Sequence, residues 1–121
     1  MAELCGVHHV SLNVADTEAT TRFYVDVLGL KQIDRPDFGF PGAWLAMADG
    51  RQVHLIEVDQ WVAPKGQHFA FHVQDLDGTR ADLQAKGVKV SEPSEIVGVG
   101  RQAFFKDPAG NLLELNEPIA H

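Results

Sequence analysis

The amino-acid sequence contains an internal repeat at about half its length, and this repeat limits the folds that the chain can adopt. Residues 7–16 match residues 66–75, with an offset of 59 positions throughout. The matched residues are His9 with His68, Val14 with Val73, and Asp16 with Asp75. Because similarity at a fixed spacing indicates a structural unit that is present more than once, we expect two similar modules.

The repeat continues in the later part of each half. Residues 49–55 align with residues 109–115 at an offset of 60. The equivalent positions include a turn glycine in each half and one pair of potential metal ligands; they are Gly50 with Gly110, and His54 with Glu114. The correspondence therefore covers most of the chain.

Helix start and stop signals occur at the same place in both halves. Asp16 and Asp75 each precede a helix-like stretch, at residues 17–28 and 76–86, and a glycine follows the last turn of each. Asp favours the N-cap position of a helix, and Gly favours the position just after its end. We therefore expect one helix in each half.

Short strands are predicted on both sides of each helix. The strands between the helix and the turn glycine lie around residues 31–35, 43–47, 88–90 and 101–106. Each half thus has the order strand, helix and three strands, which predicts an α+β fold built from two βαβββ modules. The modules cover approximately residues 5–60 and 64–118 of a single domain, residues 1–121.

Composition and charge exclude several functional classes. The 121 residues fit one hydrophobic core and carry a net charge of −7 at pH 7. A chain this acidic, with no run of Lys or Arg, is poorly suited to nucleic acid or to anionic membranes. No apolar stretch approaches the roughly 18 residues that a membrane helix needs, and no export signal opens the chain. We expect a soluble, cytoplasmic protein that binds neither nucleic acid nor membranes.

Four repeat-related positions carry side chains that can bind a metal: His9, His54, His68 and Glu114. Two copies of one module related by a pseudo-twofold axis would bring the four positions around one point. Neutral imidazoles with one carboxylate suit Zn, Ni, Fe, Mn or Co better than Ca, which prefers oxygen ligands. The pattern predicts one site for a divalent metal ion.

The sequence resembles the vicinal oxygen chelate superfamily, which includes glyoxalase I, extradiol dioxygenases, and the fosfomycin- and bleomycin-resistance proteins. The resemblance covers nearly the whole chain and rests on segments in the family's order. These are residues 9–16 (HVSLNVAD), 23–30 (FYVDVLGL), 53–57 (VHLIE), 68–73 (HFAFHV) and 106–115 (KDPAGNLLEL). The resemblance implies paired βαβββ modules whose curved mixed sheets form a cup around a divalent metal.

The resemblance also assigns the ligands by position. The first, third and fourth metal ligands of the family fall on His9, His68 and Glu114. The second falls on His54, a position that is often Glu or Gln in the family and that some members leave without a ligand. Whether His54 binds the metal therefore stays open at this stage.

Other residues have two interpretations each. His72 would face the cup near its rim, as a structural residue or as a contact for the substrate. Arg51 and Arg101 are candidates to hold an anion or to be simply solvated. Glu57 has the opposite strand parity from His54, which predicts a solvated or ion-paired carboxylate.

The remaining large aromatic side chains are expected in the core rather than in a pocket. They are Phe38, Phe40, Trp44, Phe69 and Phe71. Trp44, like Trp61, is also placed where it could border a cavity.

The resemblance implies a metal-dependent enzyme that acts on a small oxygenated molecule. We expect isomerisation or lyase chemistry of the glyoxalase (lactoylglutathione lyase) type, in which Glu114 is a metal ligand and a candidate general base. One alternative is an Fe(II) ring-cleaving dioxygenase, since two His and one carboxylate suit that metal. Another is a binding protein that confers resistance by holding a small molecule without catalysis.

The resemblance further suggests a homodimer with shared sites. His9 and His54 of one chain would meet His68 and Glu114 of the other. Pairing modules between chains would close sheet edges that are otherwise open. The alternative is a site formed by both modules of one chain.

Overall fold

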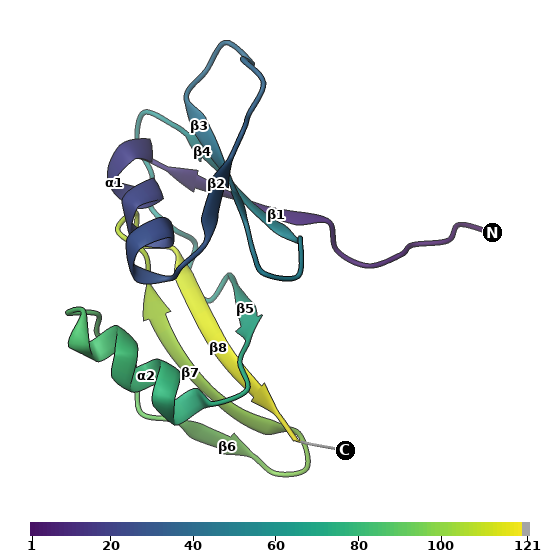
Figure 1. Ribbon diagram of the computed structural model, residues 1–121, viewed down its shortest axis with the longest axis vertical. Coiled ribbons are helices and arrows are strands. Elements are labelled where there is room, and N and C mark those ends of the chain that lie inside the picture. The colour runs from purple at the N-terminus through teal and green to yellow at the C-terminus, as the bar shows by residue number, and fades with distance from the viewer. Residues whose placement is uncertain (120–121) are drawn as a thin grey trace. The chain divides into compact units, whose positions relative to one another are not determined.

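The computed structural model describes residues 1–119, so the last two residues of the predicted domain lie outside the described part. The chain divides into two compact units, one ending at Trp61 and the next beginning at Val62. Figure 1 labels the elements of both units.

The first unit contains a four-stranded sheet and one helical segment. Its elements are β1 (His9–Val14), α1 (Thr17–Arg22), the π-helical turn η1 (Phe23–Val27), β2 (Lys31–Ile33), β3 (Gly42–Ala46) and β4 (Gln52–Glu57). The strand order is β1-β4-β3-β2, with β1 parallel to β4 and the other neighbours antiparallel. The first and last strands of this unit are therefore neighbours.

The second unit repeats this arrangement. Its elements are β5 (His68–His72), α2 (Leu76–Ala85), β6 (Ser94–Ile96), β7 (Gly100–Lys106) and β8 (Leu112–Pro118). The strand order is β5-β8-β7-β6, and β5 is parallel to β8. The predicted α+β fold with two βαβββ modules is confirmed.

Alternation along the strands separates the core from the candidate ligands. In β4, Val53 and Leu55 are fully buried, and α1 packs against β4 and β3 (Figure 1). In β8, Leu113 and Leu115 are buried in the same way. Because successive side chains of a strand point to opposite faces, the residue between each buried pair projects from the other face of its sheet.

The predicted helix caps are present in both units. The Asp16 carboxylate accepts a hydrogen bond from the Ala19 amide, and Asp75 accepts one from Gly78, each at 3.0 Å. A second carboxylate supports each helix start. Glu57 accepts from the Thr17 amide at 3.2 Å, and Glu117 accepts from the Leu76 amide at 2.8 Å. Glu57 therefore has a structural partner on the helix.

We expect Asp75→Ala to lower the free energy of unfolding by about 1 kcal/mol, because the Gly78 amide loses its acceptor. Asp82→Ala is the matched control, since Asp82 is an exposed residue within the same helix. It should change stability by less than about 0.5 kcal/mol. Urea unfolding followed by circular dichroism measures both variants. Equal losses for the two variants would contradict the capping role.

The strand predicted at residues 88–90 is wrong. The Val88 amide donates to the Leu83 carbonyl at 3.0 Å, and the Gly87 amide donates to Gln84 at the same distance. These bonds form a Schellman motif that ends α2 and occupies Val88. The strand forms later, as β6 (Ser94–Ile96).

The helix predicted at residues 17–28 is present but changes type. After Arg22 the chain continues as a π-helical turn, in which the Leu28 amide donates to the Phe23 carbonyl at 3.1 Å. Tyr24 lies in this turn and is fully buried. Gly29, with φ of +80°, then ends the segment.

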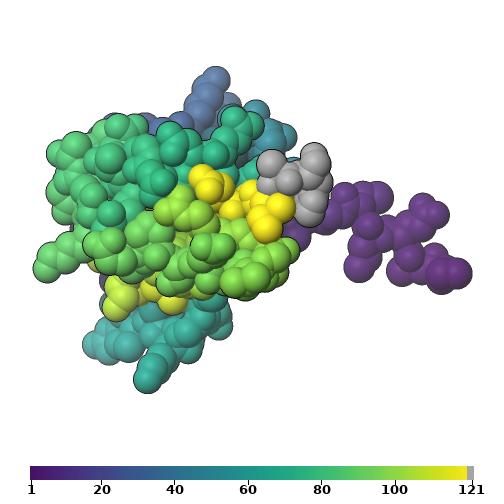
Figure 2. Space-filling view, turned by 90° about the horizontal axis from the view of Figure 1, so that it is seen from below, coloured from purple at the N-terminus to yellow at the C-terminus, as the bar shows by residue number. Residues whose placement is uncertain are grey.

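Residues 1–8 precede β1 without helix or strand. Figure 2 shows this segment in purple, and its end is held by Arg51, which donates to the Val7 carbonyl at 3.1 Å. Within residues 1–119, neither helix has both the length and the apolar character to cross a lipid bilayer.

Candidate functional site

Two of the predicted ligands, His9 and His54, lie against each other in the first unit. Their rings stack with centroids 3.9 Å apart and planes 17° apart. Trp44, on β3, stacks on His54 with centroids 4.4 Å apart and planes 8° apart. Ring contacts thus connect β1, β4 and β3 on one face of the sheet, and Trp44 borders the candidate site.

The hydrogen bonds of this pair define its donors. His54 Nε2 donates to the Gln52 side-chain oxygen at 2.8 Å, which leaves Nδ1 as the acceptor nitrogen of the neutral ring. His9 Nδ1 lies 2.9 Å from His8 Nδ1. Burial lowers the pKa of His54, and the charges of His9, His8 and Arg35 lower it further. The neutral imidazole, which is the form that binds metals, is therefore favoured at His54.

The other two predicted ligands, His68 and Glu114, form a pair in the second unit. His68 Nε2 lies 3.0 Å from Glu114 Oε1, and His68 Nδ1 donates to the Gly66 carbonyl at 2.8 Å. The hydrogen bond to Gly66 raises the pKa of His68, and the hydrogen bond and charge of Glu114 add to this, against an opposing effect of burial. The Asn116 amide donates to Glu114 Oε2 at 2.9 Å. Both carboxylate oxygens of the buried Glu114 thus have assigned partners.

The two pairs form in the same way. Ser11 is the register partner of His54, and Ala70 is the register partner of Glu114. His9 lies two residues before Ser11 on β1, and His68 lies two residues before Ala70 on β5. Each histidine is therefore on the same face as the candidate ligand of the neighbouring strand, β4 or β8, and contacts it. The parallel pairing of first and fourth strands therefore explains why the sequence repeat places the candidate ligands together.

The four candidates come together as two pairs, one in each unit. Within residues 1–119, no group of three or more His, Cys, Asp and Glu side chains is arranged to hold a metal ion. Each pair also has an aromatic neighbour from the third strand of its module. Phe104 contacts His68 edge to face at 5.3 Å, as Trp44 stacks on His54.

Sequence reasoning gave no role to Asn116, Gln52 or Arg35. Asn116 and Gln52 could have been noticed, because each lies two residues from a candidate ligand on the same strand face. His72 is exposed at the end of β5, where Asn116 is its register partner. The position of His72 is thus known, and both of its interpretations remain.

The predicted anion holders are paired with carboxylates. Arg101 contacts both carboxylate oxygens of Asp77, at 2.9 and 3.0 Å, and lies 3.7 Å from Glu117. The hydrogen bond from Arg101 lowers the pKa of Asp77. Arg51 similarly lies 2.9 Å from Asp49. These partners neutralise both guanidinium groups.

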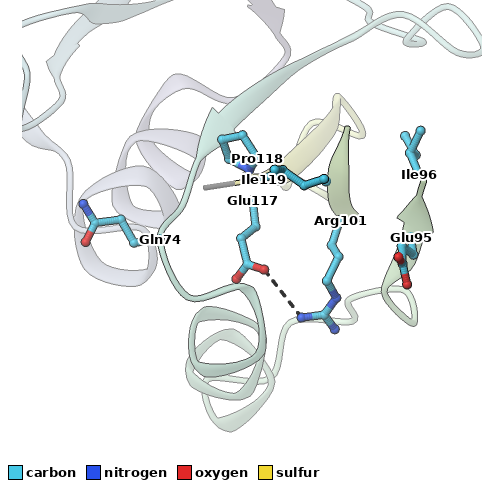
Figure 3. Close-up of a pocket in the computed structure, with 8 residues that line it drawn as sticks. Gln74, Glu95, Ile96, Arg101, Glu117, Pro118 and Ile119 are labelled. Atoms are coloured by element: carbon cyan, nitrogen blue, oxygen red, sulfur yellow. Dashed lines mark ion pairs between the residues drawn. The ribbon is translucent and has the colours of Figure 1, made fainter. Parts of the chain in front are cut away.

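Arg101 and Glu117 line a pocket of about 420 Å³ in the second unit (Figure 3). Glu95 lies beside the pair, and the apolar part of the lining comes from Ile96 and Ile119. None of the four candidate metal ligands lines this pocket. The pocket is therefore distinct from both ligand pairs, and the Arg101 guanidinium in it is already paired with Asp77 and Glu117.

The chain is similar to known proteins both in sequence and in fold. The family model described as "Glyoxalase/Bleomycin resistance protein/Dioxygenase superfamily" matches residues 6–115. The matched range contains all four candidate ligands and both βαβββ modules apart from the last residues of β8.

Individual relatives carry different activities. The chain is 30% identical to a lactoylglutathione lyase of Haemophilus influenzae, over 90% of each chain. It is 28% identical to a manganese-dependent 2,3-dihydroxybiphenyl 1,2-dioxygenase of Geobacillus genomosp. 3, over 94% of this chain and 37% of the longer relative. The solved structure of TnmS3, an antibiotic binding protein from Streptomyces sp. CB03234, is 30% identical with a TM-score of 0.81, over 98% of this chain and 100% of that chain.

Proposed function

Since the chain belongs to the Glyoxalase/Bleomycin resistance protein/Dioxygenase superfamily, we propose that it is a divalent-metal enzyme acting on a small oxygenated substrate, with isomerisation or lyase chemistry of the lactoylglutathione lyase type. The observation that carries this proposal is the contact between His68 Nε2 and Glu114 Oε1, matched by the His9–His54 stack in the first unit. The full-length similarity to the Haemophilus enzyme supports the choice of reaction.

The donor atoms fit a transition metal. Histidine ligands of metals usually donate their second ring N–H to a carbonyl or carboxylate, which fixes the ring orientation. The hydrogen bond from His68 Nδ1 to the Gly66 carbonyl has this form and directs Nε2 to the same place as Glu114 Oε1. The hydrogen bond from His54 to Gln52 likewise fixes that ring. Imidazole and carboxylate ligands suit Zn, Ni, Fe, Mn or Co.

A bound divalent metal would supply Lewis-acid stabilisation of negative charge on a substrate oxygen. Within the chain, Asn116 holds Glu114 Oε2 and leaves Oε1 as the oxygen that faces His68. Glu114 is therefore the candidate general base, taking a substrate proton on Oε1 and returning it to a neighbouring atom. The ring of Trp44 contacts His54, and the ring of Phe104 contacts His68.

Two other functions have specific support. The Geobacillus relative is a manganese-dependent 2,3-dihydroxybiphenyl 1,2-dioxygenase, and two His with one carboxylate suit iron-dependent oxygenases. TnmS3 is an antibiotic binding protein, and this chain matches all of its length. Retained ligand pairs in both units favour an enzyme over a binding protein that works without a metal.

An activity screen separates these functions. The protein is reconstituted with Ni, Co, Mn, Zn or Fe(II) and assayed with hemithioacetals, catechols and fosfomycin. Metal-dependent turnover of a hemithioacetal supports the proposed function. Ring cleavage of a catechol with Fe(II) or Mn would assign the dioxygenase reaction instead. Tight binding of a small molecule without turnover or metal would assign the binding protein.

We expect close to one divalent ion for each 121-residue chain, because the two pairs together supply one set of four ligands. The protein is purified without a chelator or a His-tag, reconstituted with metal and measured by elemental analysis. The double variant His68→Ala/Glu114→Ala is the control and should retain little metal. A reconstituted wild-type protein without stoichiometric metal would contradict the proposed site.

We further propose that the protein is a homodimer in which His9 and His54 of one chain join His68 and Glu114 of the other. Each unit holds two candidate ligands, so a complete site needs a second unit from the same chain or from a partner. The strands β1 and β5 are at sheet edges and carry His9 and His68. Open edges favour pairing with another chain, which supports the shared arrangement.

A further inference from the structure

A series of ring contacts continues from the His9–His54 pair into the loop between β2 and β3, the loop at the top of Figure 1. Beyond Trp44, the ring of Phe38 lies 6.0 Å away at 43°, and Phe40 lies 5.9 Å from Phe38 at 23°. We call these five side chains the ring ladder: His9, His54, Trp44, Phe38 and Phe40.

The outer end of the ring ladder is exposed. Phe38 and Phe40 were expected in the core, but they are 50% and 44% exposed. The loop that carries them includes Asp37 and Gly39, which form a tight turn with a 2.9 Å hydrogen bond and a φ of +82° at Gly39. This turn separates the two rings by one residue and presents both at the surface, so the expectation for the core is wrong here.

Arg35 lies over both exposed rings. Its guanidinium carbon is 4.9 Å from the centre of the Phe38 ring and 5.0 Å from that of Phe40, and it also donates to the Phe40 carbonyl at 3.1 Å. Cation–π contacts of this kind fix a guanidinium while leaving N–H donors available.

The guanidinium of Arg35 has no carboxylate partner within 4.0 Å among residues 1–119, in contrast to Arg22, Arg51, Arg80 and Arg101. In a chain with a net charge of −7, an arginine without such a partner is available to an anion.

We propose that the ring ladder and Arg35 bind a small aromatic carboxylate, with its ring against Phe38 and Phe40 and its carboxylate on the Arg35 guanidinium. Flat apolar surfaces next to a fixed cation complement a molecule that has both a planar ring and a negative charge. That a small aromatic carboxylate is also the substrate of the enzyme rests on the proposed function. Its binding to Arg35, Phe38 and Phe40 does not depend on a metal.

Three probe molecules distinguish the contribution of the ligand's aromatic ring to binding from that of its negative charge. 2-Naphthoate has both, 2-naphthylmethanol has the ring alone, and cyclohexanecarboxylate has the charge without a planar ring. Isothermal titration of the full-length protein, as purified and after treatment with a chelator, measures each affinity. We expect 2-naphthoate to bind at least about tenfold more tightly than either other probe, a difference of roughly 1.4 kcal/mol.

Variants test the two parts of the surface separately. Arg35→Gln should weaken 2-naphthoate about tenfold and change 2-naphthylmethanol less than about twofold, because only the charge is lost. The double variant Phe38→Leu/Phe40→Leu should weaken both naphthyl probes about fivefold, because it removes both aromatic faces. Since both rings are about half exposed, we expect the variant to keep its fold. Arg22→Gln is the matched control, because Arg22 is an exposed arginine on α1.

Equal affinities for the three probes, or an affinity for 2-naphthoate that Arg35→Gln leaves unchanged, would overturn the inference. Failure of the proposed function is seen separately, as a missing metal in elemental analysis. The probe series after chelation continues to report on the ring ladder in that case.

Discussion

Replacement of His68 by alanine is expected to weaken the binding of a divalent metal at least about 100-fold. This loss exceeds the roughly 10–100-fold loss that is typical when a residue hydrogen-bonded to a metal ligand is replaced. The Gly66 carbonyl fixes the His68 ring, and Nε2 lies at the carboxylate of Glu114. The variant therefore loses a pre-oriented ligand and leaves Glu114 Oε1 without its partner. Titration with Zn or Mn, followed by calorimetry, measures the change.

His72→Ala is the matched control for this experiment. His72 is an exposed histidine on the same strand and, by alternation, on the same face, four residues after His68. It should leave the affinity for the metal within about threefold of the wild type, a change of less than roughly 1 kcal/mol. Similar losses for the two variants would show that His68 has no special role.

The three histidines of the proposed site should not contribute equally to the affinity for the metal. We expect His9→Ala to lower this affinity as much as His68→Ala does, and His54→Ala to lower it least. His54 is buried between the rings of His9 and Trp44. Its contribution is therefore divided between packing and binding. A titration in which His54→Ala is the most damaging of the three would reverse this order.

Two variants that are inactive alone are expected to restore one another in a mixed dimer. With His9→Ala in one chain and Glu114→Ala in the other, one shared site receives both changes and its counterpart receives neither. The isolated hybrid should regain about half of the metal of the wild type, since one of its two sites is intact. Differently tagged chains, co-expressed and purified in sequence, provide the hybrid for elemental analysis.

The controls for this experiment are the two parental homodimers, in which both sites carry a change. A hybrid without regained metal would contradict a site shared between chains, because a site within each chain cannot be restored by a partner. A monomer in analytical ultracentrifugation would contradict the dimer itself.

The repeat allowed most of the fold to be predicted, because its signals are local. The caps at Asp16 and Asp75 depend on neighbours in sequence, and both of them appear in the structure. The strand expected at residues 88–90 failed because an equally local signal, the C-terminal motif at Gly87 and Val88, uses the first of these residues.

The pairing of the candidate ligands was predictable from the repeat, but their surroundings were not. The spacing of Asn116 and Gln52 places them on the same strand face as a candidate ligand, but it does not show that their side chains hydrogen-bond to that ligand. Phe38 and Phe40 have the composition of core residues, and only the turn at Gly39 places them at the surface. The exposure of Phe38 and Phe40 thus depends on the geometry of their loop, which a sequence pattern leaves undefined.

The position of each ligand pair on the first and last strands of its module affects the order of folding. His68 and Glu114 are 46 residues apart in sequence, whereas β3 and β4 are joined by a short turn. Because closing a long loop costs more entropy than closing a hairpin, each pair forms late within its module. The first module also leaves the ribosome before the second. A nascent chain of which only the first module has emerged therefore offers two of the four proposed ligands. Tight metal binding to the proposed site requires the second module as well.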